Sequence, residues 1–318
     1  MPPDSPIHAW LPKRAGRPLK RRLFGSGQMA RYRAELGLML LPYLLGVLAM
    51  IIVPAIAIVA IAFTSYDAVT SPAWNSFGNF PEIFGERLFW LGAANSLRFA
   101  AMAVPLRLLS ALALALLLNR GGRGFGAYRV AVYLPTVVPD AAYALIWLWL
   151  FNPYYGPINR LLSAAGLPAP EWLVHGRTAL PALAIMSAFQ IGEGLVVLLA
   201  GLQDAPREYY DAAAIDGGNR WQIFRRITLP LLAPWLVLLT IRDIILSTQS
   251  TFTPAWLMTR GGPYYATLFL PMFVYNEAFE RFLFGHAAAM LLIMFLWIGA
   301  LLWLLYEVVG GWGYDDDV

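Results

Sequence analysis

The sequence predicts an all-α membrane protein with six transmembrane helices, and composition is the first observation behind this prediction. Of its 318 residues, 59% are hydrophobic and 13% are charged. Soluble proteins are about 45–50% apolar and about 25% charged, so the composition argues against a soluble enzyme and against a disordered chain. The second observation is six apolar runs, each longer than the roughly 20 residues that a helix needs to cross a bilayer. The third is proline inside these runs, as at Pro105 and Pro139, which a membrane bundle tolerates.

The six runs define one membrane domain over residues 37–308. A basic tail at residues 1–36 precedes it, and a short tail at residues 309–318 follows it. The chain has no cysteine and three scattered histidines, so neither a disulfide nor a metal site is expected. The spans are expected at about residues 37–64, 95–118, 131–151, 179–202, 231–253 and 285–307.

The distribution of Lys and Arg predicts that both termini are cytoplasmic. With the N-terminus inside, the inner segments hold 15 basic residues and the outer segments hold 5. The two sets have nearly equal lengths, 87 and 88 residues, so length does not explain the bias. Positive charge collects on the cytoplasmic side of membrane proteins, and we therefore expect residues 203–230 to form a cytoplasmic loop.

This loop between the fourth and fifth spans is the most informative polar segment. The stretch "REYYDAAAID" predicts a short helix, and Gly217 can take the positive φ that ends it. The stretch "NRWQIFRRITL" predicts a second short helix, after which Pro230 marks the beginning of the next span. A helix, a glycine turn and a second helix with an apolar stripe indicate a docking element without catalytic groups. An amphipathic loop lying on lipid headgroups is the alternative.

The loop resembles the EAA loop of permease subunits of binding-protein-dependent ABC importers. Asp211-Ala212-Ala213, Gly217 and Ile227-Thr228-Leu229-Pro230 match its spacing, with Asp in place of the family's first Glu. The resemblance implies the fold of a type I ABC importer permease, with this loop inserted into a cleft of an ATPase subunit. The implied coupling residues are Glu208, Asp211, Ala212, Ala213, Gly217, Ile227, Leu229 and Pro230.

Further stretches are similar to the sugar-permease branch typified by maltose and glycerol-3-phosphate importers. They include "LMTRGGPYYAT" at residues 257–267 and "YLPTVVPDAAYALIWLWLFNPYYGPIN" at residues 133–159. The Gly-Gly-Pro element is more like the first permease of such heterodimers. The resemblance implies uptake of a mono-, di- or oligosaccharide or a polyol, delivered by an external solute-binding protein, across a bacterial or archaeal plasma membrane.

The chain has no phosphate-binding loop of the G-x-x-x-x-G-K-[ST] type, so ATP-driven transport would need another polypeptide. We therefore expect no cofactor in this chain, with ATP and Mg²⁺ on partner subunits. The resemblance implies a complex with a second homologous permease, two ATPase subunits and the solute-binding protein. No interaction with nucleic acid is expected.

Polar residues inside a membrane tend to face a wet interior, which makes them candidates for substrate contacts. Gln190 and Glu193 lie three apart in the fourth span, so we expect them on one helix face. The candidate substrate-binding residues are Gln190, Glu193, Asp243, Ser247 and Ser250.

Other roles remain open for several charged residues within the spans. Arg242 and Asp243 are equally well interpreted as salt-bridge partners that hold two permeases together. Arg107 could pair with either acid, Glu193 or Asp243, and Asp140 could cap a broken helix.

Two other classes of function compete with an ABC permease for a sugar. A proton-coupled secondary transporter would use Glu193 or Asp243 as its relay, although six spans without an inverted repeat weigh against it. A membrane enzyme would need a paired-carboxylate or metal site, which the sequence does not show. Within the ABC class, the solute could also be glycerol-3-phosphate or another non-sugar, and the sequence leaves the particular sugar open.

Overall fold

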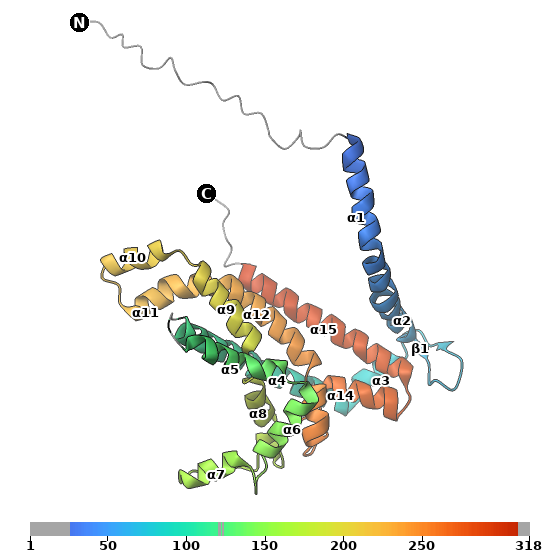
Figure 1. Cartoon of the computed structure of the whole chain (residues 1–318). Coiled ribbons are helices and arrows are strands. Elements are labelled where there is room, and N and C mark those ends of the chain that lie inside the picture. The colour runs from blue at the N-terminus through green and yellow to red at the C-terminus, as the bar shows by residue number, and fades with distance from the viewer. Residues whose placement is uncertain (1–25, 120–121, 123, 311–318) are drawn as a thin grey trace, which may run out of the picture. The chain divides into compact units, whose positions relative to one another are not determined.

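The computed structural model describes residues 26–119, 122 and 124–310, and most of them are helical (Figure 1). The chain falls into two compact units, residues 1–57 and 58–318. Most of the two expected tails lies outside the described residues. The first helix begins at Ser26, within the segment expected as the N-terminal tail.

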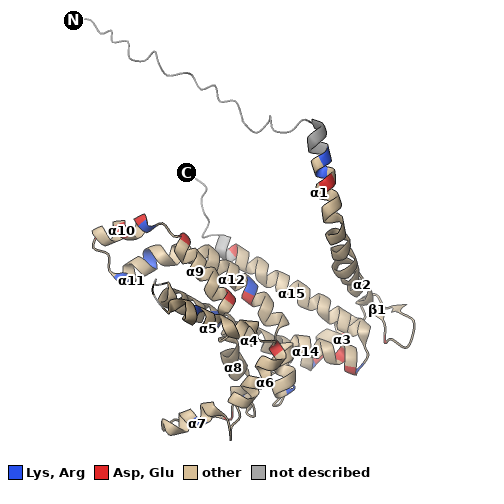
Figure 2. Cartoon of the chain, viewed as in Figure 1, with Lys and Arg blue, Asp and Glu red and all other residues tan. Residues whose placement is uncertain are grey.

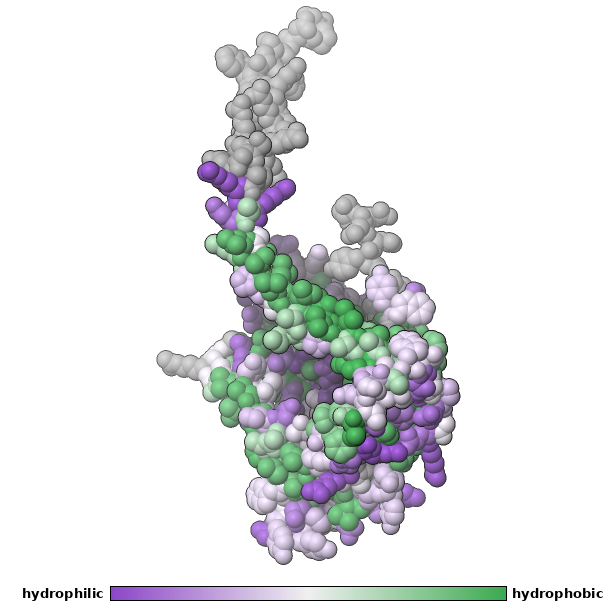
Figure 3. Space-filling view, turned by 90° about the vertical axis from the view of Figure 1, so that its right-hand side faces the viewer, coloured by the Kyte–Doolittle hydropathy of each residue, from purple (hydrophilic) through white to green (hydrophobic). Residues whose placement is uncertain are grey.

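The helix α1 (Ser26–Val47) continues through the π-helical turn η2 (Leu48–Ile52) into α2 (Val53–Ile61), whose residues from Ile58 on belong to the second unit. Residues 31–61 form one candidate span with no buried side chain in its most apolar window. Figure 3 shows it as hydrophobic beyond a short hydrophilic start. A helix that is apolar all round suits a lipid or subunit environment. The π turn precedes Pro54, whose missing N–H would otherwise interrupt the α-helical hydrogen bonds.

The second unit contains a two-residue hairpin and the remaining helices. The strands are antiparallel, with Thr64 opposite Trp74. The elements are β1 (Thr64–Ser65), β2 (Ala73–Trp74), α3 (Asn79–Gly85), α4 (Arg87–Leu118), α5 (Phe125–Val137), α6 (Asp140–Leu150), α7 (Pro157–Ala164), α8 (Gly176–Ser187), α9 (Gly192–Asp204), α10 (Arg207–Ile215), α11 (Arg220–Ile223), η3 (Phe224–Thr228), α12 (Leu229–Gln249), α13 (Phe252–Pro254), η4 (Ala255–Thr259), α14 (Leu270–Tyr275), η5 (Asn276–Glu280) and α15 (Phe284–Gly310).

Within the described residues, four helical stretches are long and apolar enough to cross a membrane, or up to six if two bent pairs each count as one span. The unbent stretches are residues 31–61, 87–118, 220–259 and 284–307. The helices α5 and α6 bend by 103°, and α8 and α9 by 48°. Each of the spans expected at about residues 131–151 and 179–202 is therefore a pair of helices joined at a bend. Pro139 explains the first bend, since it cannot donate a hydrogen bond and favours an extended residue before it, as Val138 is.

The helix α4 is the central element of the second unit and packs against α8, α9, α12 and α14. Its first half joins an aromatic cluster that includes Phe99, Trp147 and Phe269. Its second half joins an aliphatic cluster with α9 and α12. The helices approach closely because small residues line the contacts: a Cβ on Gly201 would lie 2.6 Å from Trp235 Cδ1. These contacts place the polar groups of three helices opposite one another.

Candidate functional site

A chain of polar contacts joins α9, α12 and α4 in the middle of the bundle. Arg107 of α4 donates from Nη2 to Ser247 Oγ at 2.6 Å, and its Nη1 lies 3.9 Å from Asp243 Oδ1. Arg242 Nη1 donates to the same Asp243 oxygen at 2.9 Å, and Arg242 Nη2 pairs with Glu193 Oε2. Figure 2 shows acidic and basic residues side by side where α9 meets α12. The two positive and two negative charges balance, and the buried Arg107 and Asp243 are partners of each other, as buried charges require.

Burial distinguishes the two ends of this polar cluster. Asp243 and Ser247 have 4% and 0% of their surface exposed, and they lie four apart on one face of α12. Arg107 is also buried. Glu193 and Arg242, by contrast, are partly exposed. Of the two acids that the sequence leaves open as partners of Arg107, the structure places Asp243 next to it.

The structure separates the two residues predicted from the fourth span. Glu193 lies in the first turn of α9, whereas Gln190 lies in the non-helical break after α8. Their expected shared helix face is wrong because the helix does not continue through residues 188–191. Ser250 follows the last residue of α12, and its hydroxyl donates to the carbonyl of Leu246 at 2.7 Å.

Gln190 and Ser250 meet at a small cavity beside the polar cluster. It measures about 40 Å³, less than a sugar needs, since ligand pockets are about 300–1,000 Å³. Two of its polar atoms, Arg107 Nε and Thr251 Oγ1, are buried without a hydrogen-bond partner among the described residues. The lining also includes Asp140, Tyr143 and Ser187.

Sequence reasoning missed three polar residues of this cavity, Thr251, Tyr143 and Ser187. Thr251 directly follows Ser250, a predicted substrate-binding residue, so extending that set by one position would have included it. Tyr143 stands among aromatic residues, and only the structure shows its hydroxyl donating to the carbonyl of Met186 at 2.8 Å. Asp140 is the first residue of α6 and does not cap it, because Pro139 occupies the N-cap without a side-chain hydrogen bond.

The loop at residues 203–230 has the predicted helix and glycine turn. The helix α10 ends at Ile215, and Gly217, two residues further on, has φ +73°. The Gly218 amide donates to Ala213 O at 2.9 Å and the Gly217 amide to Ala214 O at 3.2 Å, which is the Schellman pattern. Asn219 and Gln222 then form a reciprocal capping box at the start of α11. A turn closed at both ends is stiff.

The second helix of this loop is not a separate short helix. The elements α11, η3 and α12 run on without a break, within a stretch of 40 residues from Arg220 to Thr259. Pro230 does not end the helix, because it follows the π-helical turn η3, whose bonding skips the missing N–H.

The tip of the loop is exposed and partly apolar. No residue of α10 or α11 is buried, and Ile215 and Trp221 are 87% and 66% exposed. Of the predicted coupling residues, Glu208, Asp211, Ala212, Gly217 and Pro230 are exposed, and Ala213, Ile227 and Leu229 are half-buried. Behind the loop lies a groove of about 560 Å³, lined by Asp211, Tyr210, Arg207 and Thr228 together with the end of α4.

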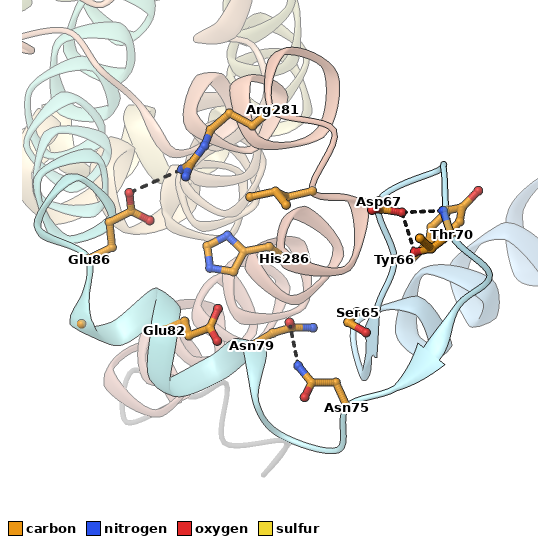
Figure 4. A pocket seen from close by; sticks show the side chains of 12 residues that line it. Ser65, Tyr66, Asp67, Thr70, Asn75, Asn79, Glu82, Glu86, Arg281 and His286 are labelled. Carbon is orange, nitrogen blue, oxygen red and sulfur yellow. Dashed lines mark hydrogen bonds and ion pairs between the residues drawn. The ribbon is translucent and has the colours of Figure 1, made fainter.

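A polar pocket of about 660 Å³ lies near the other end of α4, between the hairpin, α3 and the start of α15 (Figure 4). Glu277, 1% exposed, sits behind it, where it accepts a hydrogen bond from Arg281 at 2.6 Å and pairs with His286 at 3.2 Å. Burial raises the pKa of Glu277, but the hydrogen bonds and charges of His286 and Arg281 outweigh it, so the pKa is below its usual value. Hydrogen bonds from Thr70 lower the pKa of Asp67 at the rim.

Comparison with known proteins shows the family. Residues 107–310 match the family described as "Binding-protein-dependent transport system inner membrane component". A probable ABC transporter permease, YesP of Bacillus subtilis, is 34% identical over 87% of this chain and 90% of its own length. The trehalose/maltose transport system permease MalF of Thermococcus litoralis is 32% identical over 77% of this chain and 84% of its own.

A solved structure confirms the predicted fold class. It is a bacterial alginate ABC transporter in complex with an alginate pentasaccharide-bound periplasmic protein, and a chain of it has a TM-score of 0.76. The match covers 88% of this chain and 96% of that chain, at 21% sequence identity. By sequence and by fold, the chain belongs to the inner-membrane permease subunits of binding-protein-dependent ABC transporters, which carry solute and are not themselves enzymes.

Proposed function

We propose that the chain is a permease subunit of a carbohydrate importer and works with a second permease, two ATPase subunits and an external solute-binding protein. The observation that carries the importer assignment is the family match together with the exposed, stiff loop at residues 203–230. The sugar assignment is supported by the trehalose/maltose permease among its relatives and by the alginate importer among solved structures. It is also supported by a neutral polar cluster with amide and hydroxyl groups nearby.

The unbroken helix from the loop to the polar cluster suggests how ATP hydrolysis would drive transport. From Arg220 to Asp243 the helical rise of about 1.5 Å per residue amounts to about 35 Å. Closure of the ATPase subunits on the loop would therefore move the Asp243 end of the same helix. The small cavity at Gln190 and Ser250 would widen in another state of this movement, so that sugar hydroxyls contact Gln190, Ser250 and Thr251.

In this proposal the charged residues have different tasks. Asp243 and Ser247 are held by Arg107 and contact the substrate only when that contact loosens. Glu193 is the accessible acid and can reach the solute more easily. The loop faces the cytoplasm of a bacterium or archaeon, with both termini on that side, as the distribution of basic residues predicts.

The test compares two glycines with the same backbone conformation. Gly217 has φ +73° and Gly166, at the end of α7, has φ +72°, and an added Cβ would meet nothing within 4 Å at either. Both Gly217→Val and Gly166→Val therefore impose similar backbone strain. Only Gly217→Val should abolish ATPase binding and sugar uptake in vesicles containing the whole complex. Normal assembly and uptake of Gly217→Val would contradict the coupling role, and uptake driven by a pH gradient without ATP would favour a secondary transporter.

The substrate class needs its own measurement, because the coupling test does not depend on it. Vesicles loaded with ATP should take up a neutral or acidic oligosaccharide presented with the cognate binding protein. Gln190→Ala and Ser250→Ala should reduce that uptake and leave ATPase binding unchanged. If only glycerol-3-phosphate or an amino acid is taken up, the carbohydrate assignment is wrong and the importer assignment stands.

A further inference from the structure

A second pocket of about 470 Å³ lies between the first half of α4, the beginning of α8 and the loop at residues 261–267. It is separate from the polar cluster and from the groove behind the coupling loop. One part of its lining is apolar, and the other carries two arginines, an asparagine and two tyrosines. The apolar lining consists of Leu91, Ala101, Met102, Leu180 and Pro181, and the polar lining of Asn95, Arg98, Arg177, Tyr264 and Tyr265.

The loop that forms one wall is fixed to α4 by buried polar side chains. Asn95 Nδ2 donates to Tyr265 O at 2.8 Å and to Leu268 O at 3.1 Å. Ser96 Oγ accepts from the Leu270 amide at 3.0 Å. Tyr264 and Tyr265 both have positive φ, 49° and 62°, a conformation that tyrosine rarely takes unless its surroundings hold it. The wall therefore presents two tyrosines, of which Tyr264 is 97% exposed.

The charge of this pocket is uncompensated. Arg98 and Arg177 both line it, and no Asp or Glu does. Neither arginine forms an ion pair with any residue that the structure describes. An unpaired guanidinium next to apolar surface in a membrane is costly, so an anion from outside the chain would stabilise both. Arginine pairs with phosphate in a bidentate manner.

The position of the pocket along α4 and α8 fits a lipid, with its headgroup at the charged end of the pocket and an acyl chain beyond it. The pocket places Arg98, in the first half of α4, beside Arg177, the second residue of α8, so the charge lies toward the end of the bundle where α8 begins. Met102, Leu106 and Leu109 follow Arg98 on the same face of α4 by their spacing, and all three are exposed. This apolar stripe runs on from the charged end toward the middle of the span.

We propose that this pocket binds an anionic phospholipid, with the phosphate between Arg98 and Arg177 and one acyl chain along Met102, Leu106 and Leu109. The tyrosines lie at the level of the headgroup, where aromatic rings collect in membrane proteins. A soluble anion would use the arginines but not the stripe. An acidic residue of another subunit would also pair with the arginines without needing the apolar stripe. A lipid contacts both the arginines and the stripe.

The experiment is native mass spectrometry of the full chain, purified within its membrane complex and stripped of lipid. The complex is titrated with phosphatidylglycerol, with phosphatidylcholine of the same acyl chains, and with free glycerol phosphate. We expect a preference for phosphatidylglycerol, and little competition from glycerol phosphate. The variant Arg98→Gln with Arg177→Gln removes both charged hydrogen-bond donors to the phosphate, so it should weaken retention of phosphatidylglycerol by about tenfold or more.

The matched control removes two other exposed arginines, as Arg87→Gln with Arg160→Gln, which do not line the pocket. It should retain the lipid as the unaltered chain does. Should the double glutamine variant fail to assemble, Arg98→Lys with Arg177→Lys keeps both charges and should lose no more than a few-fold in retention.

Three results would each overturn the proposal. The first is an unaltered complex that shows no preference between phosphatidylglycerol and phosphatidylcholine. The second is competition by glycerol phosphate as effective as that by the lipid, which would indicate a site for soluble anions. The third is equal loss of lipid in the control pair, which would indicate a general effect of surface charge.

Discussion

Two almost fully buried carboxylates, Asp243 and Glu277, are held in different ways. Asp243 is 4% exposed and contacts Arg107, from another helix, and its chain neighbour Arg242. Glu277 is 1% exposed and contacts Arg281, four residues on, and His286 at the start of α15. The first acid lies inside a membrane span, and the second lies beside a large polar pocket (Figure 4).

The difference lies in what each cation can do if its acid is removed. The side chain of Arg107 is 9% exposed, whereas that of Arg281 is 56% exposed. Without its partner, Arg281 can turn to water, but Arg107 would remain as an uncompensated charge among apolar helices. Breaking a buried pair is costly chiefly because of the charge left behind. Equal burial of two acids therefore does not mean equal importance.

The largest effect is expected from Asp243→Asn. It should destabilise the protein by about 3–5 kcal/mol, the typical cost of leaving a buried charge unpaired. Thermal unfolding of the purified complex measures it. The matched control is Asp140→Asn, the same chemical change at an exposed acid in no ion pair with the described residues. Similar unfolding temperatures for the two variants would show that Arg107 finds water or another partner.

A smaller effect is expected from Glu277→Gln. The amide oxygen can still accept a hydrogen bond from Arg281. The free energy of unfolding should therefore fall by about 1–3 kcal/mol, the cost of a strained or unmade buried hydrogen bond. Glu280→Gln is the control, because Glu280 is an exposed acid in the same π-helical turn. A loss at Glu277→Gln as large as that at Asp243→Asn would remove the contrast between the two clusters.

Glu277 should also make the stability of the protein depend on pH. Because its pKa is lowered from the usual 4.5 in the folded protein, ionised Glu277 stabilises the fold at neutral pH. This contribution is lost as the pH falls below the unfolded value and through the folded one. Unfolding temperature should therefore decline less steeply in acid for Glu277→Gln than for the unaltered chain. If the unfolding temperatures of the two proteins fall in parallel as the pH falls, Glu277 is not the source of the acid dependence.

The smallest effect is expected from Glu193→Gln. Its carboxylate is 51% exposed and Arg242 is 33% exposed, and pairs in contact with solvent contribute roughly 0–1 kcal/mol. High salt should reduce even this difference by screening. If Glu193→Gln instead lowers the free energy of unfolding by several kcal/mol at any salt concentration, Glu193 lies in a dry environment, as Asp243 does.

The spans were predictable from the sequence because each contains a long apolar run. A helix of that composition is stable chiefly when lipid or other helices surround it. The turn at Gly217 was predictable too, since its positive φ and the Asn219 cap depend on neighbouring residues alone. The bends were not predictable in the same way. Pro105 lies inside the unbroken helix α4, whereas Pro139 marks a bend of 103°, so the packing around each proline decides its effect.

Pairing between residues far apart in the sequence was the other feature that the sequence could not predict. The contact between Arg107 and Asp243 joins residues of two helices far apart in the chain. The sequence could not choose between Glu193 and Asp243 as the partner of Arg107. Gln190 was misplaced because no proline or glycine directly precedes it to signal the break between α8 and α9.

The continuity of α11, η3 and α12 has a consequence for the rotational phase of the helix. Each residue of an α-helix turns the chain by about 100°. One residue inserted between Arg220 and Asp243 would rotate the carboxylate away from Arg107 while the capped turn keeps its own orientation. The number of residues between the two is thereby fixed by geometry, so changes in length between loop and cluster would be tolerated only in whole helical turns.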